Sequence, residues 1–456
     1  MRTVSVYGLG VAGVAAAKAF AERGIGVRLG DDSITDDMVA LADAIDSPLH
    51  AADDARGVES VLRGADALVP APGIAPNHPV IVEAHRRGIA IRSEIDIAYE
   101  WEQARPDGPR PIVAVTGTDG KTTTTMLVAA LIRESGKSCA EVGNTDVPFI
   151  AAVNEDVDAF VVECSSFRLA FTQCFRADAS IWLNIAPDHL DWHGSFEAYS
   201  ATKARIWSHD RSSDVAVLPF GDALIEGYAR SRDHHIRTFG LIDGDYRVEA
   251  GSLVGPGGPF ASVASMWRSM PHDITNSLAA CAAVLERGLV SVSHIEGALA
   301  NFQPASHRIE HVGEFKGSAW FDDSKATSPH AALTAIRAFD RVVLIAGGKN
   351  KDLDLSQLAS EPHRMQGVVA IGASQDAIVD AFTGVCTVVR ADSMETAVAQ
   401  AAMLAVPGVS VLLSPGCTSY DWYANYKQRG DDFVACVEKH FSHSNDHITT
   451  TRGGTQ

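Results

Sequence analysis

Short apolar runs alternate with longer amphipathic stretches along most of the chain. Buried parallel strands form short continuous apolar runs, and crossover helices carry one apolar face, so this alternation predicts parallel sheets covered by helices. The expected strands are Val4–Tyr7, Val27–Leu29, Ala67–Val69, Ile89–Ile91, Ile112–Thr116, Ala319–Phe321, Val342–Ala346, Val368–Ile371 and Val411–Leu413. The expected helices are Val11–Arg23, Thr122–Glu134, Ala331–Phe339 and Tyr423–His440.

Two interruptions divide this pattern. Residues 104–111 are rich in proline, and the alternation stops again near residues 303–306 before it restarts. A chain of 456 residues is also too long for a single hydrophobic core. We therefore predict an α/β protein of three domains: a Rossmann-like N-terminal domain, a central P-loop-type domain with a parallel sheet, and a Rossmann-like C-terminal domain. The predicted bounds are 1–105, 106–304 and 305–441, and a disordered polar tail is expected at 442–456.

Composition narrows the possible functions. The net charge of −19 disfavours nucleic acid as a partner, because phosphate backbones require clustered lysine and arginine. No uninterrupted apolar run has the length of about 18 residues that a membrane helix needs. The start of the chain leads directly into a strand, so we expect a cytoplasmic protein. We also expect no membrane insertion and a monomer. Seven scattered cysteines without a CxxC pair argue against a disulfide framework and a structural zinc site.

A first glycine turn follows the first predicted strand. Gly8-Leu9-Gly10-Val11-Ala12-Gly13 fits GxGxxG, and Asp31 and Asp32 follow about twenty residues later. Such a turn brings backbone amides and a helix N-terminus to a diphosphate, and the carboxylates suit a sugar hydroxyl. The pattern by itself allows NAD or any other diphosphate ligand.

A second glycine turn is more specific. Thr116-Gly117-Thr118-Asp119-Gly120-Lys121-Thr122-Thr123 connects a strand to a helix, as in a P-loop, although Val115 stands where a strict Walker A motif has glycine. Its amides and Lys121 would bind phosphates, and Thr122 could bind Mg²⁺. Glu163 ends a later apolar strand, in a Walker-B-like position. These residues predict a nucleotide site with magnesium.

The TGTDGKTT turn resembles the ATP loop of the Mur ligase family and of its folylpolyglutamate synthetase relatives. Further segments are similar to the same family: Glu163–Phe167 (ECSSF), Asn184–Asp191 (NIAPDHLD) and Tyr199–Lys203. The resemblance implies that ATP phosphorylates a carboxylate and that an amine then attacks the acyl phosphate. It also implies that the catalytic groups are Lys121, Glu163, His189 and Lys203. Two Mg²⁺ ions are implied, held by Thr122, Glu163, His189 and Lys203, the last as a carbamate.

The amino acid to be added is indicated by Asp322-Asp323-Ser324-Lys325-Ala326-Thr327-Ser328. This segment resembles the branch of the family that takes D-glutamate, whose second carboxylate needs cations and hydroxyls. The implied D-glutamate contacts are Lys325, Thr327, Lys351, Ser419 and Tyr426; the family usually has phenylalanine at the last position.

The remaining implied contacts involve ATP and the second substrate, UDP-N-acetylmuramoyl-L-alanine. The ATP contacts are Gly117, Thr118, Asp119, Gly120, Lys121, Thr122, Thr123, Asn276, Arg308 and Asp323. Those to the UDP substrate are Val11, Ala12, Asp31, Asp32, Gly73, Asn144 and His189.

Three other interpretations explain part of the sequence. An NAD-dependent dehydrogenase explains the first glycine turn but not Lys121, Glu163 and the Asp188-His189 pair together. A folylpolyglutamate-type ligase shares the ATP loop but has no use for a first domain with its own diphosphate turn. A nucleotide-binding regulator without catalysis has no need for every chemical position of the family.

Overall fold

The computed structural model describes residues 1–442, which form two compact units that meet in sequence between Gln303 and Pro304. The predicted tail lies outside the described residues, apart from Ser442, which ends the last helix and so is not part of a tail. Among the described residues, no helix is both long and apolar enough to cross a membrane.

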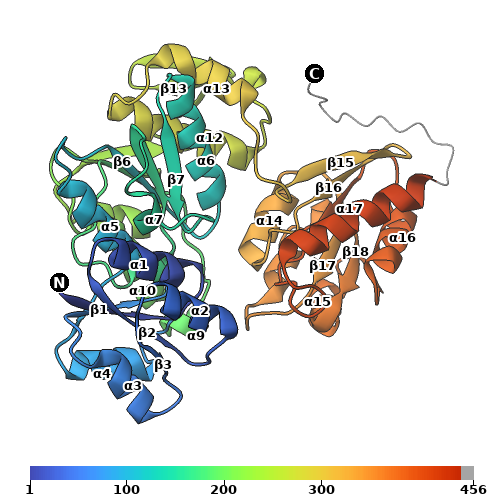
Figure 1. Ribbon diagram of the computed structural model, residues 1–456. Helices are drawn as coiled ribbons and strands as arrows, with labels where there is room; N and C mark the ends of the chain where they lie inside the picture. Colours follow the sequence, from blue (N-terminus) through green and yellow to red (C-terminus); the bar gives the residue numbers. More distant parts are fainter. Residues whose placement is uncertain (443–456) are drawn as a thin grey trace. The chain divides into compact units, whose positions relative to one another are not determined.

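The first sheet of the N-terminal unit is parallel and has five strands in the order β3-β2-β1-β4-β5. Helices α1 and α2 lie on one face and α3 and α4 on the other (Figure 1), because right-handed crossovers run in opposite directions from the central strand β1. The elements are β1 Thr3–Tyr7, α1 Val11–Glu22, β2 Gly26–Asp31, α2 Asp36–Ala44, β3 Leu49–Ala51, α3 Ala55–Leu62, β4 Ala67–Pro70, α4 Pro79–Arg86 and β5 Ala90–Ile91.

The second sheet has six parallel strands in the order β11-β10-β9-β6-β8-β7. Its strands are β6 Ile112–Thr116, β7 Cys139–Gly143, β8 Ala159–Glu163, β9 Ala179–Trp182, β10 Val215–Pro219 and β11 His235–Phe239. Helices α6 Lys121–Glu134 and α12 Pro271–Glu286 pack on one face in one apolar cluster. The carboxyl ends of β6, β8 and β9, which are neighbours in the sheet, carry the loops of the candidate site.

The two sheets of this unit share a core. One apolar cluster contains Phe20 of α1, Ile97 of α5 (Glu94–Gln103), Phe149 of α7 (Phe149–Ala152) and Phe160 of β8. The remaining elements are α8 Ser166–Leu169, α9 Leu190–His193, α10 Phe196–Lys203, α11 Ala223–Ala229, α13 Ile295–Asn301 and an antiparallel sheet of β12 Arg247–Glu249, β13 Ser252–Gly255 and β14 Gly258–Ser262. The sequence pattern did not predict that antiparallel sheet.

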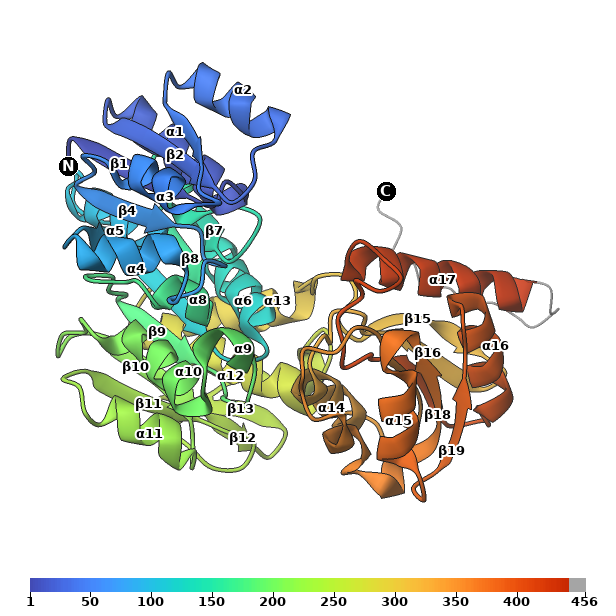
Figure 2. The same cartoon turned by 90° about the horizontal axis from the view of Figure 1, so that it is seen from below.

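The second unit has one sheet in the order β15-β16-β20-β17-β18-β19, parallel except for β15. Figure 2 shows α16 and α17 on the opposite side of this sheet from α14 and α15, so the unit is doubly wound as predicted. Its elements are β15 Glu310–Phe315, β16 Ser318–Asp322, α14 Pro329–Arg337, β17 Val342–Gly347, β18 Met365–Ile371, α15 Gln375–Phe382, β19 Thr387–Arg390, α16 Met394–Leu404, β20 Ser410–Leu413 and α17 Tyr426–Ser442.

Every predicted strand and helix is present, and the errors within these predicted elements lie at their ends. The strand expected from Ile89 begins at Ala90, and the helix expected to reach Phe339 stops at Arg337. The helix expected from Tyr423 begins at Tyr426, because Asn425 caps it: its Oδ1 accepts a hydrogen bond from the Gln428 amide at 3.0 Å.

The close approach of α1 to β1 depends on Gly13. A Cβ added at this position would overlap the carbonyl oxygen of Gly8, whereas a Cβ added at Gly10 would meet no atom within 4 Å. We expect Gly13→Ala to lower the free energy of unfolding by about 1–3 kcal/mol, the usual cost of overpacking. Gly10→Ala is the matched control and should unfold at the temperature of the unaltered chain. Equal melting temperatures for the two variants would contradict this account of the turn.

Candidate active site

The loop between β6 and α6 folds tightly around its own backbone. Gly120 has φ of 80°, a left-handed conformation that glycine adopts without strain. Lys121 Nζ bends back over the loop and donates to the carbonyl oxygens of Gly117 at 3.0 Å and Thr118 at 2.7 Å. Helix α6 begins at Lys121, so the backbone amides of its first turn and its positive end lie next to the loop. The arrangement suits an anionic phosphate group.

Two asparagines from other elements contact this loop. Asn184 follows β9, and its Oδ1 accepts hydrogen bonds from the amides of Thr118 at 3.0 Å and Asp119 at 2.9 Å. Asn276 of α12 lies against Gly120, where an added Cβ would come within 2.8 Å of its Oδ1. The sequence placed Asn276 among the ATP contacts and Asn184 only in the NIAPDHLD segment, whereas the structure shows Asn184 holding the loop in shape.

Glu163, the last residue of β8, is almost completely buried next to β6. Its Oε1 accepts a hydrogen bond from Asn144 Nδ2 at 2.9 Å. Its Oε2 is buried and has no hydrogen-bond partner among the residues that the structure describes. Buried carboxylate oxygens are normally satisfied, so this atom is suited to bind a cation.

Lys203, at the end of α10, is buried on the other side of the same loop. Its Nζ donates to the carbonyl oxygen of Gly117 at 2.7 Å and lies 4.6 Å from the centre of the Tyr199 ring. Burial, and next the charge of Lys121, lower the pKa of Lys203 well below its ordinary value. The neutral amine that this favours is the form that reacts with CO₂ to give a carbamate.

The segment after β9 carries a cluster of aromatic and imidazole rings. His189 has φ of 53°, its Nε2 lies 3.2 Å from Asp188 Oδ2, and its ring centre is 4.6 Å from that of Phe167. His193, which the sequence analysis did not select, stacks on Phe167 and hydrogen-bonds to Ser166 Oγ at 2.9 Å. Burial, and then the charges of His189 and Lys203, lower the pKa of His193 to about 4, so this ring is neutral near pH 7.

In the first domain, Asp31 and Asp32 each accept a hydrogen bond from another residue of the chain. Asp31 Oδ2 accepts a hydrogen bond from the Leu9 amide at 2.7 Å and so stabilises the first glycine turn. Asp32 Oδ1 accepts from the Tyr7 hydroxyl at 2.6 Å. At the start of α1, Val11 is 69% exposed, an unusual position for a valine and one that suits contact with a ligand, while Ala12 is buried.

A tryptophan connects the first domain to the His189 segment. The indole nitrogen of Trp192 donates to the carbonyl oxygen of Gly73 at 3.2 Å. Gly73 belongs to the loop after β4, and Trp192 belongs to α9. Within the N-terminal unit the structure therefore brings the predicted contacts Gly73, Asn144 and His189 to the side of the second sheet that holds the glycine loop and Glu163.

The other predicted contacts lie in the second unit. Asp323 is buried, and its Oδ2 accepts a hydrogen bond from Ser414 Oγ at 2.6 Å. Burial raises the pKa of Asp323 to about 7, and the charge of Arg308 acts in the opposite direction. These two predicted ATP contacts are thus electrostatic neighbours.

The predicted D-glutamate contacts lie on neighbouring loops of that unit. Lys325 Nζ lies 4.1 Å from the centre of the Tyr426 ring. The loop containing Lys351 pairs with the loop containing Ser419 through the Lys349 and Thr418 backbones, which hydrogen-bond at 2.9 Å. Thr327 is half-buried in the turn before α14, and Ser419 is buried.

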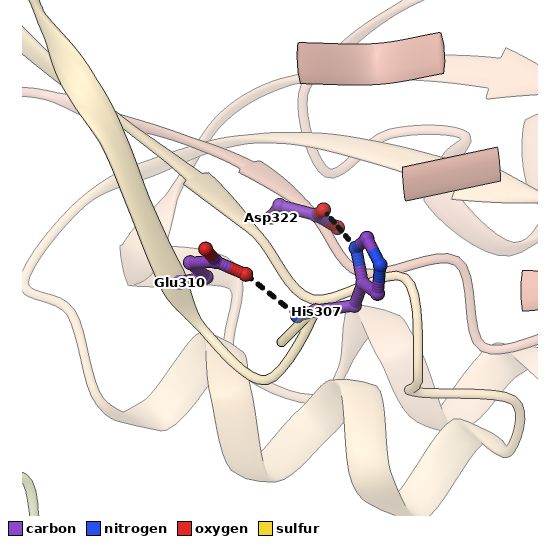
Figure 3. Close-up of side chains that lie close together, drawn as sticks. All are labelled: His307, Glu310 and Asp322. Atoms are coloured by element: carbon purple, nitrogen blue, oxygen red, sulfur yellow. Dashed lines mark hydrogen bonds and ion pairs between the residues drawn. The ribbon is translucent and has the colours of Figure 1, made fainter. Parts of the chain in front are cut away.

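His307, Glu310 and Asp322 converge where the second unit begins (Figure 3). His307 Nδ1 and Asp322 Oδ2 are 2.6 Å apart, and the His307 amide donates to Glu310 Oε2 at 2.8 Å. The hydrogen bond to Asp322 is the main cause of a raised pKa for His307. Three ligand atoms within 4.8 Å could suit a cation, but a Cβ added at Gly430 would overlap His307 Nδ1. The close packing leaves little room for an ion and favours the direct hydrogen bond between His307 and Asp322, which fixes the position of the neighbouring Arg308.

A parallel sheet with a glycine-rich strand–turn–helix loop, a strand-end carboxylate and a buried lysine defines a P-loop-type phosphate-binding protein. Three family models match the chain: "Mur ligase MurD-like, N-terminal domain" at residues 2–93, "Mur ligase middle domain" at 115–284, and "Mur ligase, glutamate ligase domain" at 307–417. The chain belongs to the Mur ligase family.

Individual relatives support the same family assignment. The chain is 36% identical to the UDP-N-acetylmuramoylalanine–D-glutamate ligase of Streptomyces avermitilis, over 96% of this chain and 98% of the relative. It is 37% identical to the ligase of the same name from Frankia casuarinae, over 95% of this chain and 93% of the relative.

Solved structures share the fold. The MurF ligase of Thermotoga maritima in complex with ADP is 20% identical, with a TM-score of 0.61 over 91% of this chain and 95% of that one. The UDP-N-acetylmuramate–alanine ligase MurC from the same organism is 18% identical, with a TM-score of 0.58 over 96% of this chain and 99% of that one.

Proposed function

We propose that this chain joins D-glutamate to UDP-N-acetylmuramoyl-L-alanine in a reaction driven by ATP, a step in the synthesis of peptidoglycan precursors in the cytoplasm. The observation that carries the chemistry is the arrangement around the glycine loop. Lys121 and Lys203 both donate to Gly117, and the unpartnered oxygen of Glu163 lies on the adjacent strand. The ligases named for this reaction support the choice of substrates, because the chain matches them over nearly its whole length.

In the first step, a carboxylate oxygen of the L-alanyl group attacks the γ-phosphorus of ATP, and ADP leaves. The acyl phosphate formed is then attacked at its carbonyl carbon by the amine of D-glutamate, which loses a proton as phosphate leaves. Lys121 and the loop amides are positioned to stabilise negative charge on the phosphoryl group. The neutral ring of His193 stacks on Phe167, which also contacts His189, and so helps to fix the position of the His189 ring.

Magnesium is the metal that these residues suit. Glu163 offers an unpartnered carboxylate oxygen, Thr122 a hydroxyl and His189 an imidazole, while Lys203 adds an anionic oxygen if it is carbamylated. When bound, Mg²⁺ reduces the repulsion between ATP and the substrate carboxylate, which is roughly 4 kcal/mol for two unit charges at about 4 Å in a medium of intermediate dielectric.

Selection of the amino acid is assigned to the second unit. Lys325, Thr327, Lys351, Ser419 and Tyr426 supply cations, hydroxyls and one aromatic ring, a set that suits an amino acid with a second carboxylate. In the same unit, Arg308 and Asp323 are proposed to contact ATP. In the first domain, Val11, Ala12, Asp31, Asp32, Gly73 and Asn144 are proposed to contact the UDP substrate.

The test is phosphate release from ATP with UDP-N-acetylmuramoyl-L-alanine present. We expect release to depend on D-glutamate and not on L-alanine or a diamino acid, each supplied in turn. Product mass should increase by one glutamyl residue over the UDP substrate. Release supported by either of the other amino acids, with D-glutamate inactive, would reject the proposed substrate.

A further inference from the structure

Arg429 is one of the most deeply buried large side chains of the protein, at 1% exposure. Its Nε donates to Ser324 Oγ at 3.0 Å and its Nη2 to the Ser324 carbonyl oxygen at 2.7 Å. Its Nη1 donates to the Cys417 carbonyl oxygen at 3.1 Å. A Cβ added to Gly348 would lie 3.2 Å from the same nitrogen, so a third loop packs on the guanidinium.

No carboxylate in residues 1–442 forms an ion pair with this guanidinium, and its acceptors are carbonyl and hydroxyl oxygens. Burial is the main cause that lowers the pKa of Arg429 to about 10, and the neighbouring Cys417, Asp421 and Asp322 only partly offset it. A buried cation that no carboxylate contacts directly is costly, and an uncharged residue would fill the same space at a lower cost. The charge therefore requires an explanation beyond packing.

The three loops in contact with Arg429 are those that carry the proposed D-glutamate contacts. Ser324 precedes Lys325, Cys417 lies two residues before Ser419, and Gly348 lies three before Lys351. The hydroxyl of Ser324 also donates to the Tyr426 carbonyl oxygen at 2.8 Å. One guanidinium thus fixes the relative positions of the three loops that carry Lys325, Lys351 and Ser419.

We propose that Arg429 is the positioning residue of this pocket and the source of its preference for an amino acid with a second carboxylate. It acts through Ser324, Cys417 and Gly348 rather than by touching the substrate. A dicarboxylate adds a further negative charge near the buried guanidinium when it binds, whereas a neutral analogue of the same shape does not. This inference rests on the proposed function.

The experiment uses the full chain with Arg429→Met, Arg429→Lys and, as a control, Arg390→Met, whose arginine is half-exposed and pairs with Asp376. KM is measured for D-glutamate, ATP and the UDP substrate, and kcat/KM is compared for D-glutamate and its neutral amide, D-glutamine. For Arg429→Met we expect KM for D-glutamate to rise at least tenfold and the preference for D-glutamate over D-glutamine to fall at least tenfold. KM for ATP should stay within twofold.

Arg429→Lys keeps the positive charge but lacks the planar guanidinium with its several N–H donors. Its KM for D-glutamate should therefore rise, while its preference for D-glutamate over D-glutamine should stay within threefold of that of the unaltered chain. If Arg429→Met does not fold, Ser324→Ala removes the acceptor of Nε and should raise KM for D-glutamate at least threefold with KM for ATP unchanged. Parallel rises in all three KM values, or an unchanged preference in Arg429→Met, would overturn the inference. An unaltered chain without D-glutamate-dependent phosphate release would overturn the proposed function as well.

Discussion

Glu163→Gln is expected to lower the rate of phosphate release by roughly two orders of magnitude or more, on the scale of lost electrostatic stabilisation. Glutamine has nearly the same shape as glutamate and can keep the hydrogen bond from Asn144, so the fold should be retained. It removes the negative charge from the one oxygen of this side chain that has no protein partner. A loss of this size corresponds to about 2.7 kcal/mol of activation free energy.

Raising the magnesium concentration should recover part of the lost rate if Glu163 binds the cation. Glu141→Gln is the matched control, because Glu141 lies on the neighbouring strand β7 and pairs with Arg133 at the surface. That variant should keep its turnover within twofold. Turnover of Glu163→Gln close to that of the unaltered chain would remove Glu163 from the proposed mechanism.

Lys203→Met is expected to reduce turnover by about two orders of magnitude or more, since it removes a buried group that contacts the glycine loop directly. If carbamylation is the role of the lysine, activity of the unaltered chain should also fall in buffer freed of CO₂ and return when bicarbonate is added. Methionine has a similar length and suits the buried position, so the variant should fold.

A second measurement separates carbamylation from a purely structural role. With ¹³C-bicarbonate, NMR should detect a carbamate carbon in the unaltered chain and in the exposed-lysine control Lys18→Met, but not in Lys203→Met. Absence of the signal from the unaltered chain, together with activity that is insensitive to CO₂, would show that the lysine acts as an amine.

The parts of the fold that local patterns encode were predictable from the sequence. Strand β6 and the glycine turn after it follow from an apolar run and fixed glycine spacing, and both occur where they were expected. The antiparallel sheet β12–β14 was missed because its short strands contain several polar residues and glycines, and because its buried residues Leu253 and Phe260 pack into a core formed by residues distant in the sequence. Helix ends were displaced where a cap such as Asn425 overrides the apolar pattern.

The residues of the candidate site also divide into those that local motifs identify and those that only long-range contacts place. Lys121 and Glu163 stand in short motifs whose spacing carries chemical meaning, so they could be selected before any coordinates were known. Asn184, His193 and Arg429 could not be given their positions, because each contacts residues distant in sequence: Asn184 contacts Thr118, and Arg429 contacts Ser324. Only the folded chain shows which isolated polar residue reaches such a partner.

The proposed contacts are divided between two separately folded units, and this has a consequence for how new specificities arise. Lys121, Glu163, His189 and Lys203 follow adjacent strands of one sheet, whereas the proposed amino-acid contacts belong to a different sheet in a separately folded unit. Mutations in the latter can therefore accumulate without distorting the groups proposed to transfer phosphate. Gene duplication followed by drift in the C-terminal unit could yield enzymes for amino acids of other charge while the same phosphoryl chemistry is inherited.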